Sequence, residues 1–342
     1  MAFSPNNNKP KILLLGEIVH AHNSWSSLSS ICEILTPKST NRNDFLAESR
    51  SGAFENCVAA YRTFASYEIT GRIDSTLLDS LPSSLRFICH NGAGYDQVDI
   101  AACTAHGIRV SNTPSAVDDA TADMGIFLML GALRNLNAGM ASLRRGEWRG
   151  EQQAELGHDP QGKVLGILGM GGIGKNFAKK AKAFGMKIRY HNRTRLDGSQ
   201  ETEIGAEYVD FDTLLGESDV LSLNLPLNPK TYHIISHPEF AKMKPNITII
   251  NTARGAVMDE DALVSALNSG RVHSVGLDVY EHEPDNIHPG LLSNPRVVLV
   301  PHMGTWTVET ELKMEEWAIS NVRMAVEEGK LRSIVPEQRG ME

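Results

Sequence analysis

The chain has 342 residues, of which 41% are hydrophobic and 22% charged, and its formal net charge at pH 7 is −8. It is longer than the roughly 250–300 residues at which a single core stops growing, so two domains are expected. The negative charge, without a basic block, argues against a nucleic-acid partner. No run of 18 apolar residues suggests a membrane span, and the polar N-terminus MAFSPNNNKP has no signal core, so we expect a cytosolic protein.

The first part of the chain alternates apolar runs with helix-like stretches, which predicts parallel βαβ units and an α/β domain. The loop HNGAGYDQVD follows the run 85–89 and carries glycines at 92 and 94. Ligands bind beyond the carboxyl ends of parallel strands, so this loop is either a ligand site or a plain glycine turn. The predicted strands are 11–16, 57–60, 85–89 and 108–110, and the predicted helices are 25–35, 74–80 and 98–106.

Residues 120–145 carry apolar side chains at a spacing of three to four, which predicts one long helix that bridges domains or subunits. Six strands with helices between them then match a doubly wound nucleotide-binding domain. A further amphipathic helix over 308–328 is expected to return to the first domain. The six strands are expected at 163–168, 187–191, 219–225, 247–251, 273–279 and 297–300.

The stretch VLGILGMGGIG, residues 164–174, is an apolar strand that breaks into glycines spaced G-x-G-x-x-G. The first glycine allows a tight turn, the second lets backbone approach a pyrophosphate, and the third lets helix and strand pack closely. A helix-compatible run follows, and its N-terminus favours phosphate. We therefore predict a dinucleotide site rather than a structural turn.

The strand 187–191 ends in Asn192, Arg193 and Thr194, followed by Arg195. NAD-preferring sites usually place an acidic residue there, which binds the adenosine 2′-hydroxyl and repels a 2′-phosphate. A neutral Asn192 followed by a guanidinium favours NADPH, with NADH possible. The alternative is a solvated basic turn without a ligand.

Three further strand ends place Arg254, Glu283 and His302 beside the predicted cofactor site. Reduction of a 2-keto acid needs a cation to polarise the carbonyl and an acid that titrates near neutrality, and a carboxylate can stabilise the imidazolium. Taken singly, each residue is more often a surface charge or a structural histidine. The histidines and cysteines lack the spacing of a metal site, so no metal is expected.

In their order and spacing, GMGGIG, NTARG, GLDVYEHEP and LVPHMGT resemble the motifs of the D-isomer-specific 2-hydroxyacid dehydrogenases. The resemblance covers about residues 50–335. Within that family, HNGAGYDQVD, YHNR and NTARGAVMDE look most like the fungal-type glyoxylate reductases. The resemblance implies a Rossmann cofactor domain, 114–304, inserted in a flavodoxin-like substrate domain formed by 1–113 and 305–342. It also implies a homodimer through the cofactor domain.

The resemblance further implies a role for each site residue. Arg254 would bind and polarise the substrate, His302 would be the acid/base, and Glu283 its partner. The backbone N–H groups of Ala93 and Gly94 would hold the substrate carboxylate. The expected cofactor-binding residues are Thr121, Gly169, Met170, Gly171, Gly172, Ile173, Gly174, Asn192, Arg193, Thr194, Pro226, Thr252, Ala253, Asp278 (at the nicotinamide carboxamide), His302 and Gly304.

The expected activity is NADPH-linked reduction of glyoxylate to glycolate and of hydroxypyruvate to D-glycerate. A D-mandelate-type or other bulky D-2-hydroxyacid dehydrogenase is the enzymatic alternative, and the pocket around 63–65 and Trp306 would decide it. A nucleotide-sensing binding protein on the same fold, like the corepressors that retain these residues, is the alternative from another class.

Overall fold

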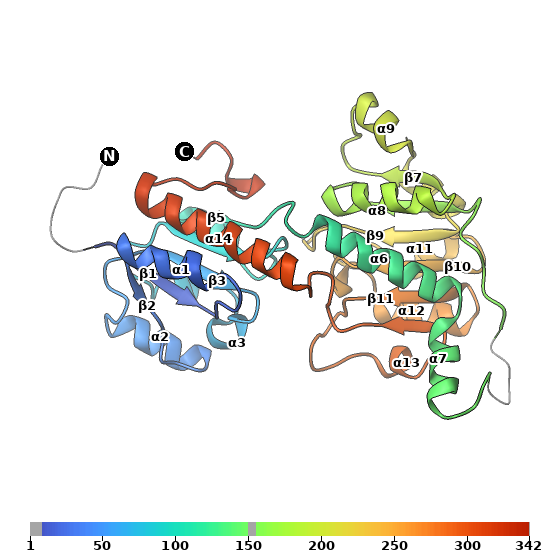
Figure 1. The fold of residues 1–342 in the computed structure, drawn as a ribbon, viewed down its shortest axis with the longest axis horizontal. Helices are drawn as coiled ribbons and strands as arrows, with labels where there is room; N and C mark the ends of the chain where they lie inside the picture. The colour runs from blue at the N-terminus through green and yellow to red at the C-terminus, as the bar shows by residue number, and fades with distance from the viewer. Residues whose placement is uncertain (1–8, 150–154, 342) are drawn as a thin grey trace. The chain divides into compact units, whose positions relative to one another are not determined.

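The computed structural model describes residues 9–149 and 155–341, which belong to two compact units (Figure 1). The first unit is Met1–Val117 with Thr307–Glu342, and the second is Asp118–Trp306. The second unit is therefore inserted in the first. The division lies within a few residues of the boundaries expected after 113 and 304.

Within the described residues, the first unit holds a five-stranded parallel sheet in the order β2-β1-β3-β4-β5. This is the order of flavodoxin-like doubly wound sheets. Its strands are β1 (Lys11–Leu15), β2 (Glu33–Leu35), β3 (Cys57–Thr63), β4 (Phe87–Asn91) and β5 (Arg109–Ser111). Its helices are α1 (His22–Ser27), α2 (Arg42–Arg50), α3 (Tyr67–Thr70), α4 (Ser75–Leu78), α5 (Ile100–Ala105) and α14 (Val308–Glu328).

The second unit holds, among its described residues, a seven-stranded parallel sheet in the order β12-β11-β10-β9-β6-β7-β8. Its strands are β6 (Val164–Leu168), β7 (Lys187–His191), β8 (Ala206–Tyr208), β9 (Val220–Leu223), β10 (Ile247–Asn251), β11 (Val272–Leu277) and β12 (Val297–Leu299). Its helices are α6 (Asp118–Leu133), α7 (Leu136–Arg144), α8 (Gly172–Ala183), α9 (Gly198–Ile204), α10 (Phe211–Glu217), α11 (His237–Lys242), α12 (Glu260–Asn268) and α13 (Pro289–Leu292).

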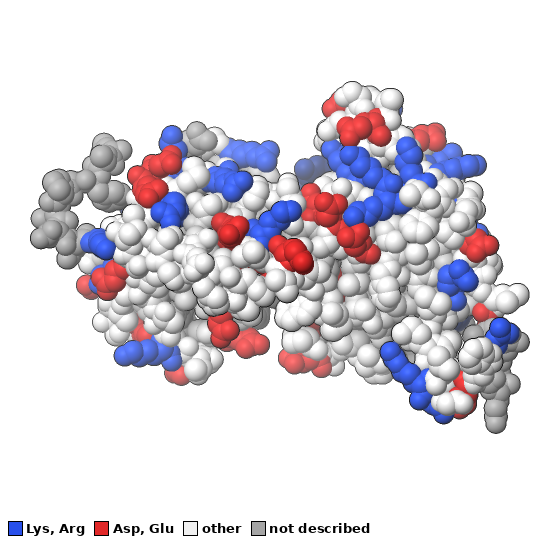
Figure 2. All heavy atoms as spheres, viewed as in Figure 1, with Lys and Arg blue, Asp and Glu red and all other residues white. Residues whose placement is uncertain are grey.

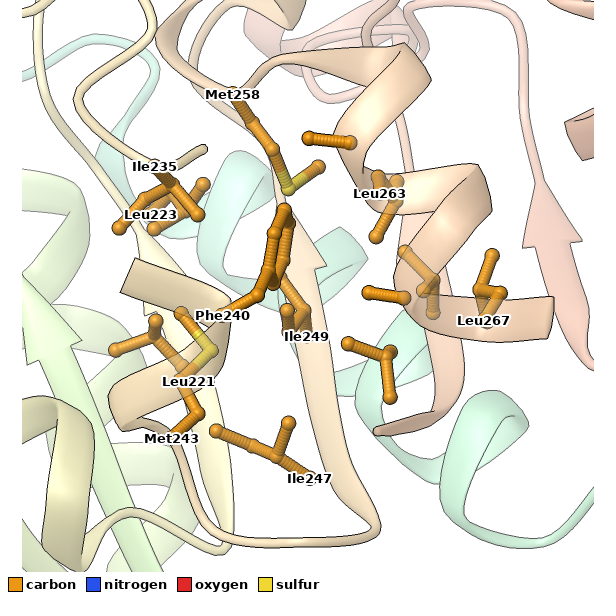
Figure 3. Packing of buried hydrophobic residues seen from close by; sticks show 14 of the residues in the cluster. Leu221, Leu223, Ile235, Phe240, Met243, Ile247, Ile249, Met258, Leu263 and Leu267 are labelled. Carbon is orange, nitrogen blue, oxygen red and sulfur yellow. The ribbon is translucent and has the colours of Figure 1, made fainter. Parts of the chain in front are cut away.

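The strand order of the second unit reverses at β6 and β9, which is where doubly wound sheets bind ligands. Strands β9, β10 and β11 are buried along their whole length, as expected for a parallel sheet covered by helices on both faces. On one face, Phe240 of α11 points into a core between Met258 and Ile249 (Figure 3). This packing fixes the strands whose carboxyl ends carry the predicted chemistry.

The α14 helix spans Val308–Glu328 as predicted and packs on β3 and β4 of the first unit (Figure 1). Its buried Glu315 accepts hydrogen bonds from the N–H groups of Val19, His20 and Ala21 at 2.8, 2.9 and 2.6 Å. These contacts bind the C-terminal helix to the segment that follows β1. The two distant parts of the chain therefore form one folded unit.

The prediction of one helix over 120–145 is wrong, because α6 and α7 are separate and meet at a bend of 77°. Asn135 lies between them with φ +51°, in the left-handed region that asparagine tolerates better than most residues. The carbonyl oxygen of Leu133, at the end of α6, accepts a hydrogen bond from the N–H of His158 at 2.7 Å. A segment distant in sequence therefore satisfies the helix end that the apolar periodicity did not predict.

The predicted helix over 25–35 is also wrong. The chain forms α1, a short 3₁₀ turn over Leu28–Ser30 and the edge strand β2 instead. Serine hydroxyls in this stretch bond to carbonyls three or four residues earlier, such as Ser26 to His22 at 2.6 Å, and so compete with a continuous helix. The sequence also missed β8, whose three residues are too few to show a periodicity.

Among the described residues, no single helix is long and apolar enough to cross a membrane. The α6 and α7 helices pass that test only when they are taken together across their bend.

Candidate active site

The loop between β6 and α8 has the geometry that a pyrophosphate requires. Gly169 has φ +100°, and a Cβ there would lie 2.7 Å from the carbonyl oxygen of Asn224. A Cβ on Gly174 would lie 2.5 Å from the carbonyl oxygen of Gly169. At Gly171, by contrast, no atom of the described residues lies within 4 Å of the place a Cβ would take. The two outer glycines thus build the turn, and the middle one leaves space at the positive end of α8.

The other residues of this loop have more local roles. Met170 is buried, and its N–H donates to Oδ1 of Asn192 at 2.6 Å, so it shapes the loop and its side chain packs in the core. Ile173 is half-buried in the first turn of α8. A Cβ on Gly172 would overlap the carboxylate of Asp118 at the start of α6. Burial of that carboxyl raises the pKa of Asp118.

The two arginines after β7 have different environments. Arg195 forms a bidentate pair with Glu201, at 2.8 Å for both Nε and Nη2, and its guanidinium lies 5.5 Å from the ring centre of Tyr208. Arg193 and Thr194 are exposed, and among the described residues Arg193 has no ion pair. Arg193 is therefore available to an anion, whereas the guanidinium of Arg195 is already bound to Glu201.

The basic side chains gathered over α8 are part of a surface of mixed sign (Figure 2). Lys179 pairs with Glu203 at 2.8 Å, and Lys180 pairs with Asp123 at 2.6 Å. Partly exposed pairs of this kind satisfy both charges. They do not extend the anion site beyond the glycine loop.

Arg254 follows β10 in a turn that is held by its neighbours. The buried Asn251 donates through Nδ2 to the carbonyl of Arg254 at 2.9 Å and accepts from the N–H of Ala253 at 3.0 Å. A Cβ on Gly255 would lie 1.9 Å from the carbonyl carbon of Tyr280, so the turn presses against the backbone that leads to Glu283. The half-buried guanidinium donates to the carbonyl of Ala253 at 2.8 Å.

Glu283 and His302 form the pair that the motifs predicted. Nδ1 of His302 lies 2.6 Å from Oε1 of Glu283, and Oε2 of Glu283 accepts from the N–H of Tyr280 at 2.9 Å. The imidazole and the carboxyl are 38% and 20% exposed. His302 has φ +52°, in the left-handed region that few residues other than glycine adopt.

Asp278 holds the backbone of this loop on both sides of the His302 side chain. It is fully buried, and its carboxylate accepts from the N–H groups of Met303 and Gly304 at 2.5 and 2.8 Å. Its carbonyl accepts from the N–H of His302 at 2.8 Å. Burial raises the pKa of Asp278, and these N–H groups act against that shift. Asp278 therefore positions the loop that carries His302. This role is separate from the cofactor contact that we expected from the sequence.

Three other predicted cofactor residues lie on α6, after β10 and after β9. Thr121 of α6 is buried, and a Cβ on Gly304 would lie 3.3 Å from the methyl group of Thr121. Thr252 is buried after β10, and Pro226 is exposed after β9. Trp306 is the last residue of the second unit and is 71% exposed.

In the first unit, Ala93 and Gly94 lie after β4 in the loop predicted to bind a carboxylate. Both are half-buried. Among the described residues, neither N–H group has a hydrogen-bond acceptor. N–H groups that have no acceptor within the protein are available to an anion.

The supporting roles of three residues could not be predicted from the sequence, although Asp278 itself was expected at the cofactor. Asn251 orders the Arg254 turn, and Asp278 fixes the His302 loop. The buried Glu260 accepts from the N–H of Glu281 at 2.7 Å and so holds the segment before Glu283. The NTARG and GLDVYEHEP patterns contain two of these residues, but only their contacts show the role.

No group of histidine, cysteine and acidic side chains in the described part of the chain is arranged to hold a metal ion. All four cysteines, Cys32, Cys57, Cys89 and Cys103, are buried and free.

The family and the fold are shown by comparison with known proteins. The family model for the D-isomer specific 2-hydroxyacid dehydrogenase, NAD binding domain, matches residues 126–304. The chain is 55% identical over 332 residues to 4-methyl-2-oxopentanoate reductase A of Aspergillus oryzae, covering 97% of this chain and 99% of that protein.

Solved structures agree with this match along nearly the whole chain. A glyoxylate reductase from Paecilomyes thermophila is 52% identical with a TM-score of 0.93, covering 97% of this chain and 99% of that one. An NADPH-dependent glyoxylate/hydroxypyruvate reductase from Sinorhizobium meliloti, solved with NADP and malonate, is 30% identical with a TM-score of 0.83, covering 96% and 98%.

Proposed function

Because the chain is an oxidoreductase that belongs to the fungal-type members of the D-isomer-specific 2-hydroxyacid dehydrogenase family, we propose that it is an NADPH-preferring reductase of glyoxylate and hydroxypyruvate. The products would be glycolate and D-glycerate. The observation that carries the proposal is the Glu283–His302 pair in the unit that also holds Arg254 and the glycine loop.

Each polar group of a 2-keto acid has a chemical counterpart in the chain. The N–H groups of Ala93 and Gly94 are suited to its carboxylate. Arg254 carries a permanent charge that would polarise the keto oxygen. His302 would donate a proton to that oxygen through Nε2, because Nδ1 is bound to Glu283. Glu283 would stabilise the imidazolium and keep the ring in place.

The second unit fits a dinucleotide because the space at Gly171 is open and α8 begins there. The glycine loop would hold the pyrophosphate, and the residues after β7 would hold the adenosine ribose. When bound, the reduced nicotinamide supplies a hydride to the keto carbon.

The proposed preference for NADPH rests on the environment of two residues. Asn192 places a neutral amide where a carboxylate would repel a 2′-phosphate, and its Oδ1 is occupied by the N–H of Met170. The neighbouring Arg193 is exposed and makes no ion pair among the described residues. A guanidinium in this position favours phosphate.

A second candidate is reduction of a bulkier 2-keto acid such as 4-methyl-2-oxopentanoate, the substrate that the Aspergillus relative is named for. Phe64 and Tyr67, just beyond β3, are 41% and 47% exposed. Large apolar side chains at the carboxyl end of a parallel strand are suited to an apolar substrate group. A D-mandelate-type activity is the third candidate, on the same grounds.

The test is the oxidation of NADPH, followed at the nicotinamide absorbance band, with four substrates in parallel. These are glyoxylate, hydroxypyruvate, 4-methyl-2-oxopentanoate and phenylglyoxylate. Fastest turnover with glyoxylate or hydroxypyruvate supports the proposal, and fastest turnover with a branched or aromatic acid replaces it. Tight NADPH binding without turnover of any of them would favour the nucleotide-sensing alternative.

We also propose that the protein is a homodimer through the cofactor domain. On α6 and α7 of the second unit, large apolar side chains are 43–57% exposed at Phe127, Leu136, Met140 and Leu143. Exposed apolar residues grouped on neighbouring helices are typical of an interface. Sedimentation equilibrium should give twice the 37.4 kDa chain mass, and a monomer at micromolar concentration would refute the proposal.

A further inference from the structure

The loop that presents Ala93 and Gly94 is anchored through three consecutive carbonyl groups. The carbonyl of Gly92 accepts from the N–H of Thr113 at 2.9 Å, and that of Ala93 accepts from Nδ2 of Asn112 at 2.8 Å. The carbonyl of Gly94 lies 2.9 Å from Nε2 of His90. With these carbonyls bound from the protein side, the direction of the N–H groups between them is fixed.

The contact between His90 and Arg62 determines which ring nitrogen of His90 carries a proton. Nδ1 of His90 lies 3.0 Å from Nη1 of Arg62. A guanidinium has only donors, so Nδ1 must be the acceptor and the proton must be on Nε2. That is the tautomer that donates to the carbonyl of Gly94. A protonated His90 would place an N–H against the guanidinium.

Arg62 is itself held in place. It is 0% exposed, and Nη2 donates to Oε1 of Gln97 at 2.5 Å. Burial lowers the pKa of Arg62 to about 10, so it keeps its charge at neutral pH. Burying a guanidinium is costly, and here the two Nη groups are bound, to His90 and to Gln97, while Nε has no partner among the described residues.

The space under the loop is filled by the same imidazole. A Cβ on Gly92 would lie 2.6 Å from Nε2 of His90. The loop can therefore lie close to the ring only because residue 92 has no side chain. This close approach of Gly92 to His90 is a second observation, separate from the hydrogen bonds, that joins the imidazole to the loop.

From these contacts we infer that Arg62 and His90 are positioning residues, which direct the N–H groups of Ala93 and Gly94 toward the carboxylate of the substrate. Arg62 selects the tautomer of His90, and His90 holds the carbonyl of Gly94. Neither side chain needs to touch the substrate. The inference rests on the proposed function, which supplies the carboxylate that these N–H groups bind.

The test separates substrate affinity from turnover in the complete enzyme. His90→Leu and Arg62→Met should raise the KM for glyoxylate about 10-fold or more, the effect of one lost charge-linked hydrogen bond. The kcat should stay within about threefold, because the proton donor is in the other unit. The Kd for NADPH should not change. His90→Gln should restore most of the KM, because its amide nitrogen can take the place of Nε2 and donate to Gly94.

His106→Leu is the matched control, because it removes an imidazole of the same unit that bonds to Asp79 instead. The KM of this variant should equal that of the wild type. The inference is overturned if folded His90→Leu keeps a normal KM, or if His90→Gln is no better than His90→Leu. If the Leu or Met variants do not fold, His90→Asn replaces them, because its amide is too short to reach Gly94.

Calorimetry with oxalate and saturating NADPH distinguishes failure of this inference from failure of the proposed function. Without turnover of any 2-keto acid, the proposed function fails. Weaker oxalate binding by His90→Leu than by His90→Gln would still support the positioning role. Equal oxalate binding by wild type and His90→Leu would refute that role, whatever the substrate of the enzyme.

Discussion

Oε1 of Glu283 lies 2.6 Å from Nδ1 of His302, so the carboxylate holds one ring nitrogen and leaves the chemistry to the other. The two residues are 19 positions apart and follow different strands of one parallel sheet. The buried Asp278 holds the His302 side of this pair, and Glu260 holds the segment before Glu283. The pair is thus fixed by the fold from both sides.

Loss of the imidazole should therefore abolish most of the activity. We expect His302→Ala to lower kcat for glyoxylate by about 100-fold or more, the usual effect of removing an acid/base group. His282→Ala, which removes an exposed histidine next to Glu283, is the control and should retain full activity. Near-normal turnover of His302→Ala would contradict the assignment of the proton donor.

The coenzyme preference should depend on Arg193 and not on Arg195. Arg193→Ala should raise the KM for NADPH by about 10–100-fold, the worth of a charge-assisted hydrogen bond, and leave the KM for NADH nearly unchanged. Arg195→Ala is the matched control, because that side chain is bound to Glu201. Steady-state kinetics with both coenzymes would test this. Equal changes in the KM for NADPH in the two variants would contradict the role of Arg193.

Asn192→Asp should shift the enzyme toward NADH. An aspartate can still accept the hydrogen bond from the N–H of Met170, so the loop is kept while a negative charge is added. That charge would repel a 2′-phosphate and bind a ribose hydroxyl. The ratio of kcat/KM for NADPH to that for NADH should fall about 10-fold or more. An unchanged ratio would mean that the 2′-phosphate binds elsewhere.

Gly255→Ala should destabilise the protein, because the new Cβ would overlap the backbone at Tyr280. The expected loss in the free energy of unfolding is about 3 kcal/mol, the upper part of the range for overpacking. Gly198→Ala, at the exposed start of α9, is the control, since its Cβ would meet no described atom within 4 Å. Urea unfolding followed by circular dichroism compares the two, and equal stabilities would contradict the close approach.

The buried thiols should be unreactive in the native protein. Burial raises the pKa of Cys32 to about 11 and the pKa values of Cys57, Cys89 and Cys103 to about 12. A thiol reagent at pH 8 should therefore label the cysteines only after denaturation. Because the folded-state pKa values lie above the unfolded value near 9, the stability from these groups is present below pH 9 and is lost between about pH 9 and 12. Rapid labelling of native protein would contradict this burial.

The sequence by itself determined the features that depend on near neighbours in the chain. Apolar runs predicted most of the parallel strands, and the spacing of Gly169, Gly171 and Gly174 predicted the turn before α8, because a tight turn and close packing restrict residue type locally. The same holds for α14, whose periodicity is uninterrupted. Arg254, Glu283 and His302 could be named because each follows a predicted strand.

Only the tertiary structure decided which polar groups pair. Arg193 and Arg195 look alike in sequence, yet one is exposed and the other is bound to Glu201. Asp278 holds the His302 loop, and Arg62 selects the tautomer of His90, through contacts between separate strands and loops. The end of α6 depends on His158, which comes 25 residues later. Such partners are brought together by the packing of distant segments, and the order of residues along the chain does not encode that packing in any local pattern.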